Sequence, residues 1–521
     1  MKVSTPAKVS DVIESLFPQA FDGERPTWPP DAFAIAASIL KQSGAYTQLV
    51  NRWPPQPPFD DVKAWARKIG SLKKQWRNKW EAYDSWPVAV NRWWRDVLTH
   101  KGTALDQVFK NPELLTALVG IVAAADETCF NFGSLSCARD LMDYYAAINL
   151  EVSGSLCFQV DASRAIVLPK LHNPYTGMTL RSLTHNLALW HSAEVTPVWK
   201  QISPPKSQAT MNLLLVPWPL KLQARSFRKA DIPEISLAQG YDFFTYDDGR
   251  SPADVDRIAM LVEQAENLVG PIYALVFPEL SLTRSDFVKV LRSQENRLVI
   301  AGIGKPARAG RYGENYVAIG IGRGKAKPWL SEQQKHHRWL VDERQIGQYA
   351  LSGSMDNSKK WWEAIRLPRR ECIFYNANEW FTFCALICED LARQDPVADL
   401  VRCVGPNLVV ALLMDGPQIE ERWSARYATV LAEDPRSSVL TLTCAGLVDI
   451  ACWQYGGGPR SIALWKDATN QTRRILLEPD AEAVALTIVH KPEREWSADG
   501  REDGRHTEYL RLVGVHQVKP Q

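Results

Sequence analysis

The stretch FCALICEDLAR, from Phe383 to Arg393, is an apolar run that ends at Cys388 and continues directly into Glu389 and Asp390. Short apolar runs bounded by polar residues are typical of strands buried in a protein core. In α/β folds, chemistry gathers where such strands end and loops begin. Cys388 is therefore a candidate nucleophile at the end of a core strand. The alternative is an inert core thiol followed by the N-terminus of a helix.

Strands and helices alternate on both sides of this stretch, from about residue 205 onward. Residues 211–220 (MNLLLVPWPL) and 271–280 (PIYALVFPEL) have the composition of buried strands. Residues 251–270, between them, have helical periodicity, with a serine at the start and a glycine at the end. This alternation predicts a layered α/β fold.

Residues 1–205 have a different pattern, which predicts a mainly helical domain. The chain contains 20 tryptophans, far above normal use, and several recur at helical spacing in this part. One predicted helix face combines Trp65, Ile69, Leu72, Trp76 and Trp80, and the opposite face is basic. Aromatic and basic residues together could form a nucleic-acid surface. We favour an amphipathic helix with buried tryptophans and solvated lysines.

The Pro- and Ser-containing stretch ISPPKSQATMN, at Ile202–Asn212, separates the two patterns. The sequence therefore predicts a helical domain of unassigned role over 1–205 and an α/β domain over 206–490. A charged C-terminal tail that could form a strand follows over 491–521.

Composition narrows the class of protein. With 521 residues, 45% apolar and 23% charged, the chain predicts a globular protein of two or more domains. The net charge of +2 gives no general attraction to nucleic acid or to an anionic membrane. The longest apolar run, Leu114–Ala125, is too short to span a bilayer, and no signal peptide is evident. Nine scattered cysteines indicate reduced thiols. We expect a cytoplasmic protein with neither a membrane nor nucleic acid as a partner.

Two further polar residues stand with Cys388 as candidates for a catalytic site. Glu279 ends the strand at 271–280, and Lys335 lies in the polar segment EQQKHHRWLVDERQ. A carboxylate can take the thiol proton, protonate a leaving amine and then activate water. An ammonium can stabilise an oxyanion and also favour the thiolate by its charge. This chemistry needs no metal and no cofactor.

These motifs resemble those of the nitrilase superfamily, the carbon–nitrogen hydrolases. FPEL contains Glu279, KHHRWLVDE places Lys335 and Glu343 eight residues apart, and LICEDL contains Cys388. Later segments, among them RWSARYATVLAED and GGGPRSIALWKD, are also similar to family segments. The resemblance covers roughly residues 210–490, with its motifs in the family order.

The resemblance implies a four-layer α-β-β-α sandwich and catalytic roles for Glu279, Lys335, Cys388 and Glu343. It implies that the backbone N–H of Glu389 helps to bind the oxyanion. The expected reaction is hydrolysis of a non-peptide carbon–nitrogen bond, in an amide, carbamoyl or nitrile group, through a thioester on Cys388. The expected partners are a small amide-type substrate and further copies of the chain, paired through the α/β domain.

The sequence also departs from the family pattern. The Cys-Glu-Asp elbow resembles that of glutamine-dependent NAD synthetases, but the Ser-Gly-Gly-x-Asp-Ser loop of those enzymes is absent. The segment between Lys335 and Cys388 is long, with its excess around residues 351–371. We predict that this excess forms a lid or an interface insertion.

Two other classes of function stay open. His336 or His337 could serve as the base of a different cysteine hydrolase. Alternatively, the chain could be a scaffold or sensor in which catalysis is secondary. By analogy with nitrilase-like domains beside reverse transcriptases, such a role could lie in bacterial phage defence.

Overall fold

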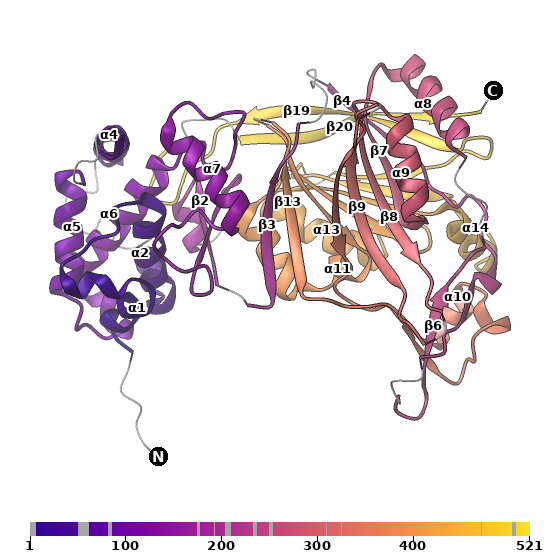
Figure 1. Ribbon diagram of the computed structural model, residues 1–521, viewed down its shortest axis with the longest axis horizontal. Helices are drawn as coiled ribbons and strands as arrows, with labels where there is room; N and C mark the ends of the chain where they lie inside the picture. Colours follow the sequence, from indigo (N-terminus) through magenta and orange to yellow (C-terminus); the bar gives the residue numbers. More distant parts are fainter. Residues whose placement is uncertain are drawn as a thin grey trace.

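The computed structural model describes residues 7–49, 62–81, 86–174, 178–191, 193–203, 210–232, 237–249, 254–308, 310–324, 326–378, 380–469, 471–502 and 507–520. The N-terminal helices lie at one end of the long axis of the molecule and the large sheets at the other (Figure 1). The protein is thus a mixed α/β structure with a helical N-terminal region, as the sequence predicts. Within the described ranges, no helix combines the length and the apolar character needed to cross a bilayer.

The helical region is built around one buried helix. Its helices are α1 (Val9–Leu16), α2 (Pro29–Ser43), α4 (Val62–Glu81), α5 (Val88–Thr99), α6 (Pro112–Thr128) and α7 (Leu141–Ser153). Helix α6 contains the apolar run 114–125 and is buried along almost its whole length, with α2, α4 and α5 packed against it. Trp65 and Trp76 of α4 are buried, which confirms the predicted core face of this helix.

The first large sheet has seven strands in the order β10-β9-β8-β7-β4-β19-β20. These are β4 (Thr210–Leu215), β7 (Ile272–Leu282), β8 (Leu298–Lys305), β9 (Glu314–Ile321), β10 (Trp329–Gln334), β19 (Ala483–Glu493) and β20 (Thr507–Val518). Strands β4, β7 and β8 are parallel, and the other pairs are antiparallel. Helices α8 (Val255–Val269) and α9 (Arg284–Ser293) pack on this sheet.

The second large sheet has the order β18-β17-β16-β15-β14-β13-β3. Its strands are β3 (Val195–Gln201), β13 (Arg370–Asn376), β14 (Thr382–Ile387), β15 (Leu408–Leu413), β16 (Ser438–Thr443), β17 (Ser461–Lys466) and β18 (Thr472–Leu476). Strands β14, β15 and β16 run parallel and are buried at every residue, as strands covered on both faces must be. Helices α11 (Glu389–Ala392), α13 (Trp423–Glu433) and α14 (Ala445–Gln454) pack against this sheet and its strand ends.

The two large sheets lie against each other, because β7 contacts β15 and β16 while β9 contacts β14. Two small sheets complete the fold. Strands β1 (Ile166–Pro169) and β2 (Leu187–Trp190) pair near the helical region, and α12 (Asp399–Val404) packs on β2. The other small sheet, in the order β11-β12-β6-β5, contains β5 (Phe227–Lys229), β6 (Tyr241–Tyr246), β11 (Leu340–Val341) and β12 (Lys360–Glu363), with α10 (Glu343–Gln348) following β11.

The parts expected over 1–205, 206–490 and 491–521 share elements in the structure. Strand β3 precedes residue 205, yet it pairs in parallel with β13 at the edge of the second sheet. Strand β20 follows residue 490 and forms the edge of the first sheet. One continuous apolar core joins residues of the helices to both sheets. The α/β part therefore extends beyond 206–490 at both ends, because β3 and β20 complete its sheets.

Candidate active site

Cys388 occupies a sharp turn between β14 and α11. Its N–H donates to the carbonyl oxygen of Leu412, the last hydrogen bond that ties the turn to the neighbouring strand β15 (2.9 Å). The backbone then turns at Cys388, with φ of 42° and ψ of −104°, and α11 begins at the next residue. A positive φ is strained for a residue with a side chain and is concentrated at functional sites. The strand therefore delivers the thiol to a rigid elbow.

Glu279 lies in an irregular part of β7. The pairing of β7 with β8 shifts register between Phe277 and Leu282, and Leu280 has a φ of 54°. Gly302 of β8 permits this irregularity, because a Cβ atom there would lie 2.4 Å from the Cα atom of Glu279. The close approach of the two backbones thus fixes where the Glu279 carboxylate lies.

A buried charged cluster surrounds Glu279. Lys335 Nζ lies 2.8 Å from Glu279 Oε1 and 2.7 Å from Glu363 Oε2. Asn315 Nδ2 donates to the same two carboxylates, at 2.8 Å and 2.7 Å. All four side chains are almost completely buried. Buried charges are tolerated only when paired, so this cluster is a fixed electrostatic unit.

The charged cluster also affects the pKa of the Cys388 thiol. Burial raises the pKa of the Cys388 thiol well above its usual value, Glu279 raises it further, and the Lys335 ammonium opposes both. Burial disfavours the charged form of Lys335, but Glu279, Glu363 and Cys388 outweigh this and hold its pKa well above the ordinary value. The net direction opposes the raised thiolate fraction that a neighbouring ammonium by itself would give, because burial and the nearby carboxylates act against Lys335.

Glu279 has the properties of a base for this thiol. Burial raises the pKa of Glu279, with Lys335 acting in the opposite direction. A raised pKa makes the carboxylate a better proton acceptor near neutral pH. Its Oε1 atom is held by Lys335 and Asn315, whereas Oε2 is buried and has no hydrogen-bond partner among the described residues. One carboxylate oxygen thus remains open for a proton.

Glu343 lies outside this cluster. It is the first residue of α10 and its side chain is exposed, because Asp342 caps the helix and the chain turns away after β11. Glu363, at the end of β12, contacts Lys335 instead and also accepts from the N–H of Trp339 (3.1 Å). Sequence reasoning missed Glu363. The sequence feature that could have indicated Glu363 is an acidic residue directly after Trp361 and Trp362, but it lies in the stretch predicted to be an insertion.

His336 and His337 are held by Asp390, two residues after Cys388. The backbone N–H groups of both histidines donate to the Asp390 carboxylate, and His337 Nδ1 lies 3.1 Å from its Oδ1 atom. His336 Nε2 lies 2.8 Å from the carbonyl oxygen of Glu371. These contacts connect the Lys335 loop to the Cys388 elbow.

Glu389 and Asp415 border the elbow. The Glu389 side chain lies 3.2 Å from Arg393, and its backbone N–H stays a predicted oxyanion donor. Asp415 follows β15, and its Oδ1 atom contacts Tyr349 and Arg422. Asp415 Oδ2 is buried without a partner among the described residues. The carboxylates of Glu389 and Asp415 both raise the pKa of Cys388. The Asp415 carboxylate, held by Tyr349 and Arg422, is therefore a second possible hydrogen-bond acceptor near the thiol.

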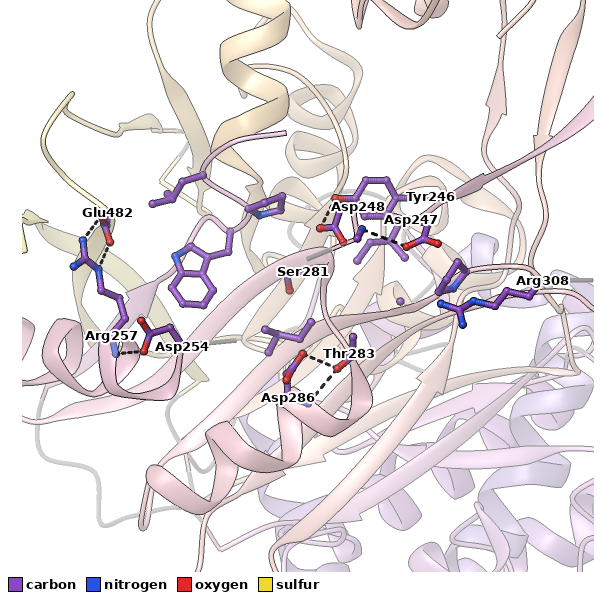
Figure 2. A pocket seen from close by; sticks show the side chains of 18 residues that line it. Tyr246, Asp247, Asp248, Asp254, Arg257, Ser281, Thr283, Asp286, Arg308 and Glu482 are labelled. Atoms are coloured by element: carbon purple, nitrogen blue, oxygen red, sulfur yellow. Dashed lines mark hydrogen bonds and ion pairs between the residues drawn. The ribbon is translucent and has the colours of Figure 1, made fainter. Parts of the chain in front are cut away.

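A cavity of about 640 Å³ lies at the carboxyl ends of β4, β7 and β8 (Figure 2). Leu280 and Ser281, which follow Glu279, line it, but the described lining includes neither Cys388 nor Lys335. Leu280 also belongs to an apolar cluster with Trp339, Tyr349 and Met414. Five carboxylates and two arginines supply the charged side chains of the lining, and several are engaged, as in the Arg257–Glu482 pair of Figure 2. The cavity and the charged cluster are therefore adjacent through consecutive residues of β7, and the cluster itself is buried.

One group of metal-ligand residue types occurs elsewhere among the described residues. Ligand atoms of Asp126, Glu127 and His185 lie within 4.8 Å of one another. Arg501 Nη1 lies 3.4 Å from Asp126 and 2.8 Å from Glu127. Because the guanidinium already supplies the cation, this group fits a structural ion network better than a metal site.

No protein-family model and no curated protein matches the sequence. Among solved structures, the chain is similar to a CN-hydrolase superfamily protein from Xanthomonas campestris with an arsenic adduct in the active site (14% identity, 53% of this chain, 90% of that chain, TM-score 0.30). It is also similar to a branch 10 member of the nitrilase superfamily from Saccharomyces cerevisiae (12% identity, 60% of this chain, 93% of that chain, TM-score 0.29).

A third similar structure is a glutamine-dependent NAD+ synthetase from Acinetobacter baumannii in complex with ADP (12% identity, 53% of this chain, TM-score 0.31). The match spans 45% of the synthetase. The solved structures that resemble this chain include carbon–nitrogen hydrolases.

Proposed function

We propose that the protein hydrolyses a non-peptide carbon–nitrogen bond of a small molecule, through a thioester on Cys388. The observation that carries the proposal is the buried cluster of Glu279, Lys335 and Glu363 beside the strained elbow of Cys388. We place this site in a four-layer α-β-β-α sandwich formed by the two facing sheets and their outer helices. A small amide-type substrate in the cytoplasm is the corresponding partner.

The first half of the reaction forms the thioester. Glu279 Oε2 takes the thiol proton as the sulfur bonds to the substrate carbonyl carbon, so a free buried thiolate never accumulates. The resulting oxyanion is stabilised by Lys335 and by the N–H of Glu389. Protonated Glu279 then gives its proton to the departing amine, and the carbon–nitrogen bond breaks.

The second half regenerates the enzyme. Glu279 takes a proton from water, the hydroxide attacks the thioester carbon, and a second oxyanion forms at the same place. Its collapse breaks the carbon–sulfur bond, and the sulfur recovers its proton from Glu279. Glu363 and Asn315 hold Lys335 and Glu279 in position throughout, because each contacts the reacting groups without taking part in proton transfer.

A panel of small amides, carbamoyl compounds and nitriles tests the proposal by the ammonia or amine released. Cys388→Ala and Glu279→Gln should each lose activity, by at least about 1,000-fold for the nucleophile. His337→Asn, which leaves Glu279 intact, should keep most of it. Full activity in Glu279→Gln together with loss in His337→Asn would instead favour a cysteine–histidine hydrolase.

The closed site also favours a second candidate, a scaffold or sensor protein. Cys388 is only 4% exposed and lies outside the described cavities. Under this candidate, no member of the panel is turned over, and Cys388→Ala leaves the stability and assembly of the protein unchanged.

A further inference from the structure

Helix α7 exposes an unusual row of large apolar side chains. Its residues Leu141, Tyr144, Tyr145, Ile148 and Val152 are 52%, 55%, 49%, 48% and 81% exposed, and the nearby Phe158 is 47% exposed. Residues three and four apart share one face of a helix, so the five form a continuous stripe. We call these six residues the α7 face.

The opposite side of α7 is also apolar. Met142, Ala146 and Leu150 are buried, and α7 packs on α4 and β3 (Figure 1). Tyr145 lies edge-on to Trp80, with ring centroids 6.0 Å apart, and Phe158 lies 4.8 Å from Trp28. A helix at the surface normally presents polar residues to water, whereas one that is apolar all round is buried. Apart from Glu151 and Ser153 in its last turn, the exposed side of α7 is apolar, which is the pattern of a helix that another surface covers.

The size of the α7 face matches one half of a specific interface. Six large side chains, each about half exposed, leave roughly 600 Å² of apolar surface, the upper end for the largest patch on a monomer. If two copies covered each other's α7 face, they would bury roughly 1,200 Å² in total, the lower end for a specific complex.

The charged residues at the two ends of α7 indicate which partner covers the α7 face. Arg139 is exposed just before α7, and Glu151 is the only exposed charged residue within the helix. The two residues mark opposite ends of α7, since Arg139 lies two residues before its start and Glu151 lies in its last turn. When two such helices pack antiparallel about a two-fold axis, Arg139 of each copy lies near Glu151 of the other, and like charges stay apart.

We propose that the α7 face binds a second copy of this chain, with the two α7 helices antiparallel. This interface lies in the helical region and is independent of the carbon–nitrogen hydrolase proposal. It differs from pairing through the α/β domain, which the family resemblance implies.

Sedimentation velocity of the full-length protein over a dilution series tests the proposal. The wild type should be a dimer that dissociates on dilution. Ile148→Glu should raise the dimer dissociation constant by about 100-fold or more, because it places two carboxylates in the apolar centre. The control Leu268→Glu, at a 54% exposed apolar position on α8, should leave it unchanged. Circular dichroism checks that each variant is folded.

Charge reversal tests the antiparallel geometry. Arg139→Glu and Glu151→Arg should each raise the dissociation constant about three- to tenfold, and the double variant should restore it. A wild type that is monomeric at all concentrations would overturn the proposal. So would an oligomer that Ile148→Glu leaves intact, since another surface would then hold it. A dimer that both single charge variants leave unaffected would overturn the antiparallel arrangement.

Discussion

At the scale of single residues, the charge balance of the cluster determines which form of Cys388 the proposed mechanism can use. Two carboxylates, Glu279 and Glu363, surround one ammonium on Lys335. A thiolate on Cys388 would add a second uncompensated negative charge in a site of low dielectric. In the proposed mechanism, proton transfer to Glu279 therefore accompanies the attack on the substrate.

The reactivity of Cys388 should reflect this balance. At pH 7, iodoacetamide should label it more slowly than the partly exposed Cys137, because burial holds its pKa high. Since the folded pKa is raised, its thiolate fraction and its labelling rate should keep rising above pH 9. Glu279→Gln should speed the labelling while abolishing turnover, and Lys335→Met should slow it. Peptide mass spectrometry gives the rates, and faster labelling in Lys335→Met would contradict the account.

Glu363 and Glu343 are both candidates for the second glutamate of the site, and matched substitutions distinguish them. Glu363→Gln removes a charge that contacts Lys335, so kcat/KM should fall by about tenfold or more. Glu343→Gln changes an exposed residue and should leave kcat/KM within about twofold of the wild type. Equal loss in both variants would show that α10 moves into the site during turnover.

At the scale of elements, the position of Glu279 depends on the close backbone contact between β7 and β8. Gly302→Ala should move β7, lower the melting temperature and cost roughly 1–3 kcal/mol of stability, with a larger loss of activity. The matched control is Gly347→Ala in α10, where a Cβ atom has no neighbour within 4 Å. Gly347→Ala should be neutral or slightly stabilising. An active, fully stable Gly302→Ala protein would show that this backbone contact does not fix the position of Glu279.

The strands and the strand-end residues Glu279 and Cys388 could be predicted because their signals are local. An apolar run and the polar residue that ends it are adjacent in sequence. Glu363 could not be predicted in this way, since β12 reaches the cluster through parallel pairing with β6, more than a hundred residues earlier. Glu343 has the family spacing from Lys335, but a helix cap at Asp342 leaves it in solvent.

At the scale of the whole molecule, long-range contacts join parts that the sequence separates. Strand β3, from before residue 205, and strand β20, from after residue 490, each form an edge of one large sheet. Arg501, from the C-terminal part, forms buried ion pairs with Asp126, Glu127 and Asp499. Such pairings are not visible in local patterns, which is why the predicted boundaries at 205 and 490 fall inside shared structure.

The Arg501 network should contribute to global stability. Arg501→Ala removes the cation that three buried carboxylates share, of which Glu127 alone keeps an ion pair among the described residues, with Lys73 at 4.0 Å, so the free energy of unfolding should fall by about 3–5 kcal/mol. Arg494→Ala breaks the exposed pair with Glu502 and should cost less than about 1 kcal/mol. Urea denaturation measures both. Equal effects of the two variants would show that the helical region does not depend on this network.

The central claim is that Cys388 forms a covalent intermediate with Glu279 as its base. The most direct test is peptide mass spectrometry of protein quenched with acid during turnover of an active amide. The account predicts an acyl increment on the Cys388 peptide of the wild type and none in Glu279→Gln. Product formation by Cys388→Ala, or an increment on a different cysteine, would contradict it.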